Sequence, residues 1–114
     1  MKPLEVQLRE SFIKLYKDDV GKGPVQTNVG VTKNYIVVEF NGIFTPLETS
    51  LLHTSDGIEL IGKLRKIIKA RCQEHHAAEV ERLLGCKVID FLSKLSIEKD
   101  TLYFLFILDK MIER

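Results

Sequence analysis

One long helical run constrains the fold of this 114-residue chain more than any other feature. Its apolar residues recur at steps of three and four, the spacing of one helix face. These residues are Leu60, Ile61, Leu64, Ile67, Ile68 and Cys72. Asp56 with Glu59 offers a capping box at the start, and Gly85 can take the left-handed conformation that ends a helix. The sequence therefore predicts a helix of roughly thirty residues, some 40 Å long at about 1.5 Å per residue.

The segment before the long helix predicts a helix, a β-hairpin and a short helix, in that order. Apolar residues at helical spacing mark a first helix over 4–20, which the glycines and proline of "GKGP" end. Alternating apolar residues then predict two strands joined across 32–34. Thr45, Pro46 and Glu48 form a capping box with proline at the first helical position, which predicts a short helix.

Two runs after the long helix, "CKVIDFLSKLSI" and "TLYFLFIL", predict a second hairpin that turns at 98–100. The resulting order is α-β-β-α-α-β-β, with no linker and no sequence repeat. We therefore predict an α+β fold with two layers, in which helices cover one face of a four-stranded, mainly antiparallel sheet. The whole chain, 1–114, is expected to form one domain.

In "TLYFLFIL" both alternating sets of side chains are apolar. One face carries Leu102, Phe104, Phe106 and Leu108, and the other carries Tyr103, Leu105 and Ile107. A single layer of helices covers only one side of a sheet, so the second side needs another partner. We predict a homodimer through that second side.

Charge and composition favour a folded soluble protein. Apolar residues make up 45% of the chain, and 17 basic against 16 acidic side chains leave a net charge of +1, which predicts no nucleic-acid partner. The basic run "GKLRKIIKAR" is predicted to place Lys63, Arg65, Lys66 and Lys69 on the outer, solvated face of the long helix. The N-terminus lacks the apolar core of a signal peptide and no window could span a membrane, so we expect a cytoplasmic protein.

Of all stretches in the chain, "RCQEHHAAEVERLLGC" most resembles a metal-binding or redox site, because it holds two cysteines, two histidines and three glutamates. Cys72, His75 and Glu79 fall on one side of the helix, but structural zinc takes four ligands from more than one element, so no metal and no cofactor is predicted. Cys72 and Cys86 would lie roughly 20 Å apart along the helix, too far for a disulfide. With no recognisable nucleophile motif, we predict no catalytic residue and no enzyme activity.

The polar residues of the long helix leave two interpretations open. Arg71, His75 and Arg82 are predicted to continue the apolar stripe, so that the helix bends or outruns its sheet and its second half meets a partner subunit. His75 would then pair with Glu79, four residues on. One interpretation is structural pairing, and the other is a pH-sensitive or anion-binding site around Arg71 and His75.

Four short patterns, in this order and spacing, resemble the MpsC family over nearly the whole chain. They are "GKGP", "FTPLE" with "TSDG" and the following Arg65, Arg71 within the long helix, and "LLGCKV". The sequence departs from a common "ARP" pattern, because Cys72 stands where that pattern has proline. The family name refers to a bacterial sodium-translocating, membrane-potential-generating system whose other parts are membrane proteins linked to inorganic-carbon uptake.

This resemblance implies a small, dimeric, non-enzymatic accessory or regulatory protein that docks on transporter subunits from the cytoplasmic side, at the inner face of the membrane. The alternative is a dimeric ligand or pH sensor with its site near Arg71, His75 and Glu79. The candidate contact residues are accordingly Arg65, Arg71, His75 and Glu79.

Overall fold

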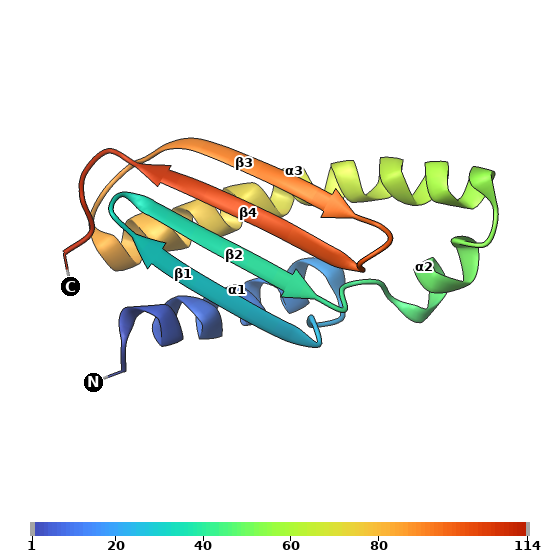
Figure 1. Cartoon of the computed structure of the whole chain (residues 1–114), viewed down its shortest axis with the longest axis horizontal. Helices are drawn as coiled ribbons and strands as arrows, with labels where there is room; N and C mark the ends of the chain where they lie inside the picture. Colours follow the sequence, from blue (N-terminus) through green and yellow to red (C-terminus); the bar gives the residue numbers. More distant parts are fainter. Residues whose placement is uncertain (1, 114) are drawn as a thin grey trace.

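A computed structural model of the protein describes residues 2–113 and confirms the predicted α+β order of elements (Figure 1). The elements are α1 (Leu4–Val20), β1 (Gln26–Thr32), β2 (Tyr35–Asn41), α2 (Pro46–Leu51), α3 (Ser55–Leu84), β3 (Val88–Ser96) and β4 (Thr101–Leu108). Among the helices of residues 2–113, none has the length and apolar character that a membrane crossing requires.

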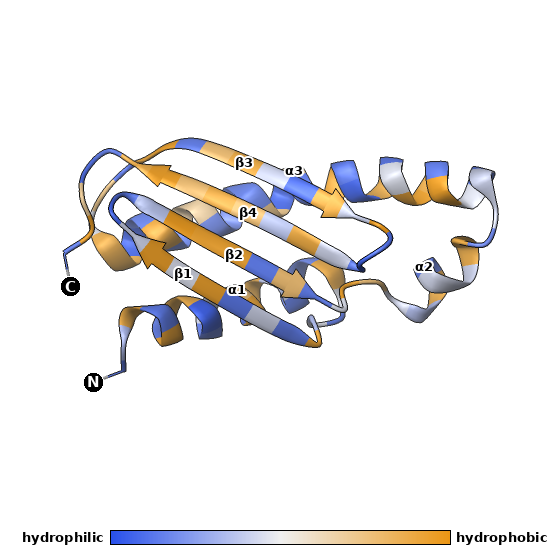
Figure 2. Ribbon diagram, in the orientation of Figure 1, coloured by the Kyte–Doolittle hydropathy of each residue, from blue (hydrophilic) through white to orange (hydrophobic). Residues whose placement is uncertain are grey.

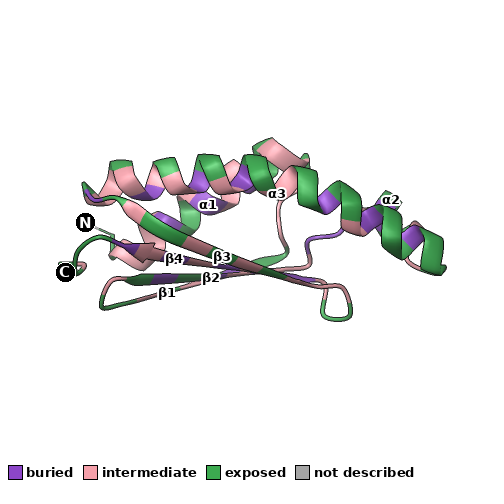
Figure 3. Cartoon of the chain, turned by 90° about the horizontal axis from the view of Figure 1, so that it is seen from above, coloured by how far each residue is buried: buried purple, intermediate pink, exposed green. Residues whose placement is uncertain are grey.

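The strands form one antiparallel sheet in the order β1-β2-β4-β3. The two hairpins join through β2 and β4, where Ile36 pairs with Phe106 and Phe40 pairs with Leu102. Helices α1 and α3 lie together on one face of this sheet (Figure 3). The predicted two-layer arrangement is therefore confirmed.

The core lies between the helices and the sheet. Of the two apolar sets of β4, the one that begins at Leu102 and ends at Leu108 is buried, and α1 adds three buried side chains to the same core. The α1 residues are Leu8, Phe12 and Tyr16. The opposite face of the sheet also carries apolar side chains, including the exposed Val37 and Leu92, and Figure 2 shows apolar colour along all four strands. Its covering by a second copy of the chain stays a prediction.

Helix α3 is the 30-residue rod that the sequence predicts, but its two halves have exchanged the expected roles. The C-terminal half packs on α1 and the sheet, and its buried stripe continues through Cys72, His76 and Val80. The prediction that Arg71 and His75 continue the stripe toward a partner subunit is therefore wrong. Instead, the N-terminal half extends past the end of the sheet together with α2 (Figures 1 and 3).

The ends of α3 show which local signals act. Gly85 adopts the predicted left-handed conformation, with φ of 63°. At the start, the cap is Thr54 and not Asp56, because the Thr54 hydroxyl accepts a hydrogen bond of 3.0 Å from the Gly57 amide. Gly57 sits against α2, where an added Cβ would lie 1.7 Å from the carbonyl oxygen of Leu51. Glycine is therefore required where α2 meets α3.

Candidate functional site

Arg65 is the centre of a buried polar cluster beneath the N-terminal half of α3. Its side chain is only 5% exposed, so the prediction that it lies on the outer face is wrong. Its Nε and Nη2 donate to the two carboxylate oxygens of Glu48, each at 2.6 Å. Nη1 donates to the Tyr16 hydroxyl, and Nη2 also donates to the carbonyl oxygen of Ile43 at 2.9 Å. One guanidinium thus joins α1, α2, α3 and the loop after β2.

Glu48 has two roles in this cluster. It completes the predicted capping box of α2, because its carboxylate accepts from the Thr45 amide at 3.0 Å while the Thr45 hydroxyl accepts from the Glu48 amide at 3.2 Å. The same carboxylate holds Arg65 in the bidentate geometry that makes such pairs strong. The Arg65 guanidinium also lies 5.3 Å from the ring centre of Phe44, within cation–π range.

The electrostatics of the cluster keep Glu48 and Arg65 ionised. Burial alone would raise the pKa of the Glu48 carboxyl, but hydrogen bonds from Arg65 and Thr45 and the charge of Arg65 hold that pKa below its usual value. Burial likewise opposes the charge on Arg65, yet Glu48 and Tyr16 raise its pKa. Burial raises the pKa of Tyr16 to about 12 despite the neighbouring Arg65 charge, so its hydroxyl stays neutral.

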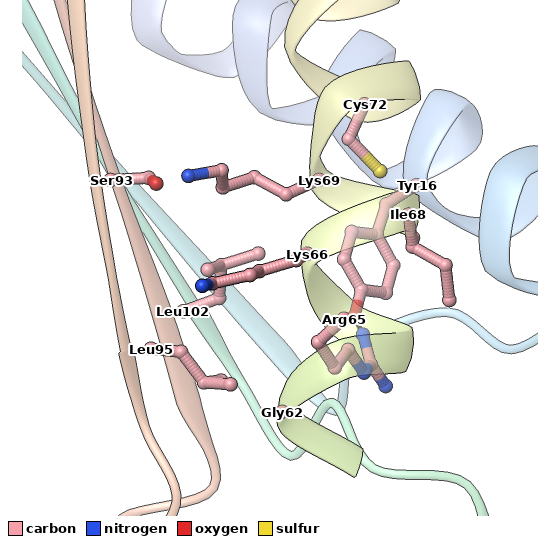
Figure 4. Close-up of a pocket in the computed structure, with 10 residues that line it drawn as sticks. All are labelled: Tyr16, Gly62, Arg65, Lys66, Ile68, Lys69, Cys72, Ser93, Leu95 and Leu102. Carbon is pink, nitrogen blue, oxygen red and sulfur yellow. Dashed lines mark hydrogen bonds between the residues drawn. The ribbon is translucent and has the colours of Figure 1, made fainter. Parts of the chain in front are cut away.

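A cavity of about 230 Å³ adjoins this cluster, between α3 and the β3–β4 hairpin. Its walls are mainly apolar side chains of Ile68, Leu95 and Leu102. Figure 4 shows the side chains of Lys66 and Lys69 extending from α3 toward the strands across this space. The cavity therefore combines an apolar wall with two cationic side chains.

The other predicted contact residues do not gather around His75. The Nδ1 of His75 lies 2.8 and 3.0 Å from the two carboxylate oxygens of Asp19 at the end of α1, and the prediction that Glu79 is its partner is wrong. Glu79 instead accepts two hydrogen bonds from Arg82, at 2.7 and 3.1 Å. Arg71 is exposed. Helix α1 packs along α3, so a carboxylate distant in sequence reaches His75.

Like Arg65, His76 is a buried ionisable residue that the sequence reasoning did not identify. Its Nδ1 lies 2.7 Å from the carbonyl oxygen of Cys72 and its Nε2 lies 3.3 Å from that of Phe12, while the rings of Phe12, Phe40 and Phe104 surround it. Burial lowers the pKa of His76, although both carbonyl contacts oppose this shift. The signal was the spacing, because His76 follows Cys72 by four residues on the apolar stripe.

Cys72 and Cys86 are both buried, and each is a free cysteine. Burial, followed by the nearby Asp19 carboxylate, raises the pKa of Cys72 to about 12, so its thiol stays protonated. Burial also raises the pKa of Cys86. Within residues 2–113, no group of three His, Cys, Asp or Glu side chains is placed to hold a metal ion.

Comparisons with known proteins place this chain in a family. The family model described as "Na+-translocating membrane potential-generating system (MpsC)" matches residues 1–110. The chain is also similar to the uncharacterized protein YrhF of Bacillus subtilis (strain 168), with 26% identity over 101 residues, which cover 88% of this chain and 83% of that protein. No solved structure matches the chain. The match over nearly the whole sequence shows that the chain belongs to the MpsC family.

Proposed function

We propose that this chain is a non-enzymatic accessory or regulatory subunit that docks, from the cytoplasmic side, on a membrane-embedded component of a sodium-translocating, membrane-potential-generating system. Membership of the MpsC family supports the choice of this system as the partner, because the family model that matches residues 1–110 is described by that system. The docking role needs a surface on this chain that a partner can cover. The overhanging half of α3 supplies one.

The docking surface consists of Leu60, Leu64 and Ile67, which recur at four and three residues on one side of α3. Their exposed fractions are 56%, 41% and 68%. Apolar side chains that share one exposed helix face are typical of a contact with another protein. This apolar face on the overhang is the observation that carries the docking proposal. We expect the partner to present an apolar groove that receives it.

The Arg65 cluster favours a preformed docking surface. Arg65 lies on the same helical segment as the three apolar residues and is bonded to Glu48 of α2 and Tyr16 of α1. These contacts fix the overhang relative to the rest of the fold before any partner binds. A surface held in this way loses little conformational entropy on association.

Co-purification from detergent-solubilised membranes of the native host tests the docking role. We expect a tagged wild-type chain to enrich a polytopic cation-transport subunit over a tag-only control. The double variant Leu60→Glu/Ile67→Glu should lose that subunit, because two carboxylates would have to be buried in the contact. The matched control Val25→Glu, at a residue that is 80% exposed away from α3, should retain it.

Two outcomes of that experiment would contradict the proposal. The first is recovery of the chain without any membrane subunit. The second is equal retention of the subunit by the double variant, which would place the contact elsewhere. Circular dichroism of each purified variant checks that the fold is intact.

A second candidate function is a pH sensor, and the contact between His75 and Asp19 is the observation that favours it. Asp19 has a buried side chain and comes from α1, so protonation of the half-exposed His75 would strengthen a link between α1 and α3. The sensor site expected from the sequence also included Arg71 and Glu79. Neither residue takes part in the hydrogen bonds of His75, which go to Asp19. Replacement of His75 by asparagine should remove a pH-dependent change in system activity if this candidate is correct, and leave it intact otherwise.

A further inference from the structure

We propose that the cavity between α3 and the β3–β4 hairpin is a binding site for a small organic carboxylate with an apolar body. This inference rests on the walls and charges of the cavity and does not depend on the docking role. It concerns a partly open space between α3 and the β3–β4 hairpin whose volume suits a small molecule and not a partner protein.

The walls of the cavity favour an apolar ligand body. Leu95 and Leu102 line it from the strands, Ile68 and Cys72 line it from α3, and Tyr16 lines it from α1 (Figure 4). Its volume of about 230 Å³ corresponds to about eight water molecules at roughly 30 Å³ each. Drug-sized ligands occupy pockets of about 300–1,000 Å³, so this ligand would be smaller.

The charges of the cavity favour an anionic head group. Lys66 and Lys69 lie one turn apart on α3, both line the cavity, and among residues 2–113 neither has a carboxylate partner. Lys63, one turn earlier, is instead paired with Glu59 at 3.4 Å. The charge of Arg65, which also lines the cavity, is matched by Glu48. The unmatched charge at this site is therefore positive.

A carboxylate fits this combination. The Lys69 side chain points toward Ser93 on β3, so an ammonium group and a hydroxyl donor face each other across the opening (Figure 4). A carboxylate between Lys66, Lys69 and Ser93 would satisfy those donors while its apolar body contacts the leucines. An inorganic anion would leave the apolar walls without contacts, and a cation would meet two ammonium groups.

Titration of the purified full-length chain with hexanoate, followed by calorimetry and by amide NMR shifts, tests the proposal. Hexanoate should bind saturably and shift the amides of Ser93 and Leu95. Acetate lacks the apolar body and hexanol lacks the charge, so each should bind at least about tenfold more weakly, which corresponds to about 1.4 kcal/mol.

Matched lysine variants locate the charge requirement. Lys66→Met/Lys69→Met keeps most of the apolar stems and should weaken hexanoate binding at least about tenfold. Lys63→Met removes a charge from the same helix outside the cavity and should leave binding unchanged. Absence of saturable hexanoate binding would overturn the proposal. So would equal affinity for acetate, or equal loss in the Lys63 variant, because either result would indicate attraction to the helix surface alone.

Discussion

Replacement of Arg65 by methionine should be among the most destabilising single changes in this protein. Arg65 and Glu48 have side chains that are each 5% exposed, and the variant would leave the Glu48 carboxylate without its cation. Breaking a buried ion pair by removing one partner costs about 3–5 kcal/mol. The total free energy of unfolding of a small domain is about 5–15 kcal/mol. Urea unfolding followed by circular dichroism should therefore show a much lower midpoint for the variant than for the wild type.

The destabilisation should depend on pH in a defined direction. In the wild type, the pKa of Glu48 is lowered in the folded state, so the pair contributes stability above the unfolded pKa of about 4.3, and this contribution is lost as pH falls through the folded value. Without Arg65, only the hydrogen bonds from Thr45 still oppose burial, so the pKa of Glu48 should rise. Its protonation in the folded variant then relieves the buried charge, so the stability difference should shrink from pH 7 to pH 5.

A double-mutant cycle and a surface control isolate the interaction. Glu48→Gln combined with Arg65→Met should recover part of the loss, because the buried carboxylate is gone and an amide oxygen can still cap α2. Arg82→Met breaks the exposed pair with Glu79, which solvent screens, so it should destabilise the fold far less than Arg65→Met does. An Arg65→Met loss as small as that of Arg82→Met, or one that is unchanged between pH 7 and pH 5, would refute the reasoning.

Three further changes probe other parts of the fold. Gly57→Ala should cost about 1–3 kcal/mol in urea unfolding, because its Cβ would overlap the carbonyl oxygen of Leu51; a variant as stable as the wild type would contradict this close approach. The folded pKa of His76 is lowered, so its contribution to stability should fall as pH drops below about 6.5, by up to about 1.4 kcal/mol per pH unit. Comparing His76→Leu with the wild type across pH 7 to 5 measures that slope, and parallel curves would exclude it. Leu92→Lys places a charge on the outer face of the sheet and should convert a dimer into a monomer by light scattering; a wild-type monomer at micromolar concentration would contradict the predicted homodimer.

Most of the fold could be predicted because its signals are local. The two left-handed glycines that end α1 and α3, Gly21 and Gly85, act through their own backbone, and the capping box joins Thr45 to Glu48, only three positions along the chain. The strands follow from alternation within each run. The cap of α3 was misassigned because two candidate caps lie close together in the sequence. Asp56 has Glu59 three residues after it, but Thr54, three residues before Gly57, is the residue that caps the helix.

The candidate site could not be predicted in the same way because its partners are distant in sequence. Arg65 lies four residues after the buried Ile61, but a charged residue is expected to be exposed unless its partner is known. That partner, Glu48, is 17 residues away, and the Tyr16 hydroxyl is 49 residues away. The prediction for His75 was wrong for the same reason. The nearby Glu79 suggested a local pair, but His75 pairs with Asp19, which is 56 residues away.

The ion pair, the cavity and the exposed apolar face adjoin one another for one physical reason. Helix α3 is longer than the sheet beneath it, so apolar core cannot support its N-terminal half. At the end of the sheet, hydrogen-bonded polar groups replace that core around Arg65, and the remaining space between helix and strands is the cavity. A ligand there would contact both α3 and the sheet. It would therefore add a second link, beside the Arg65 cluster, between the overhang and the rest of the fold.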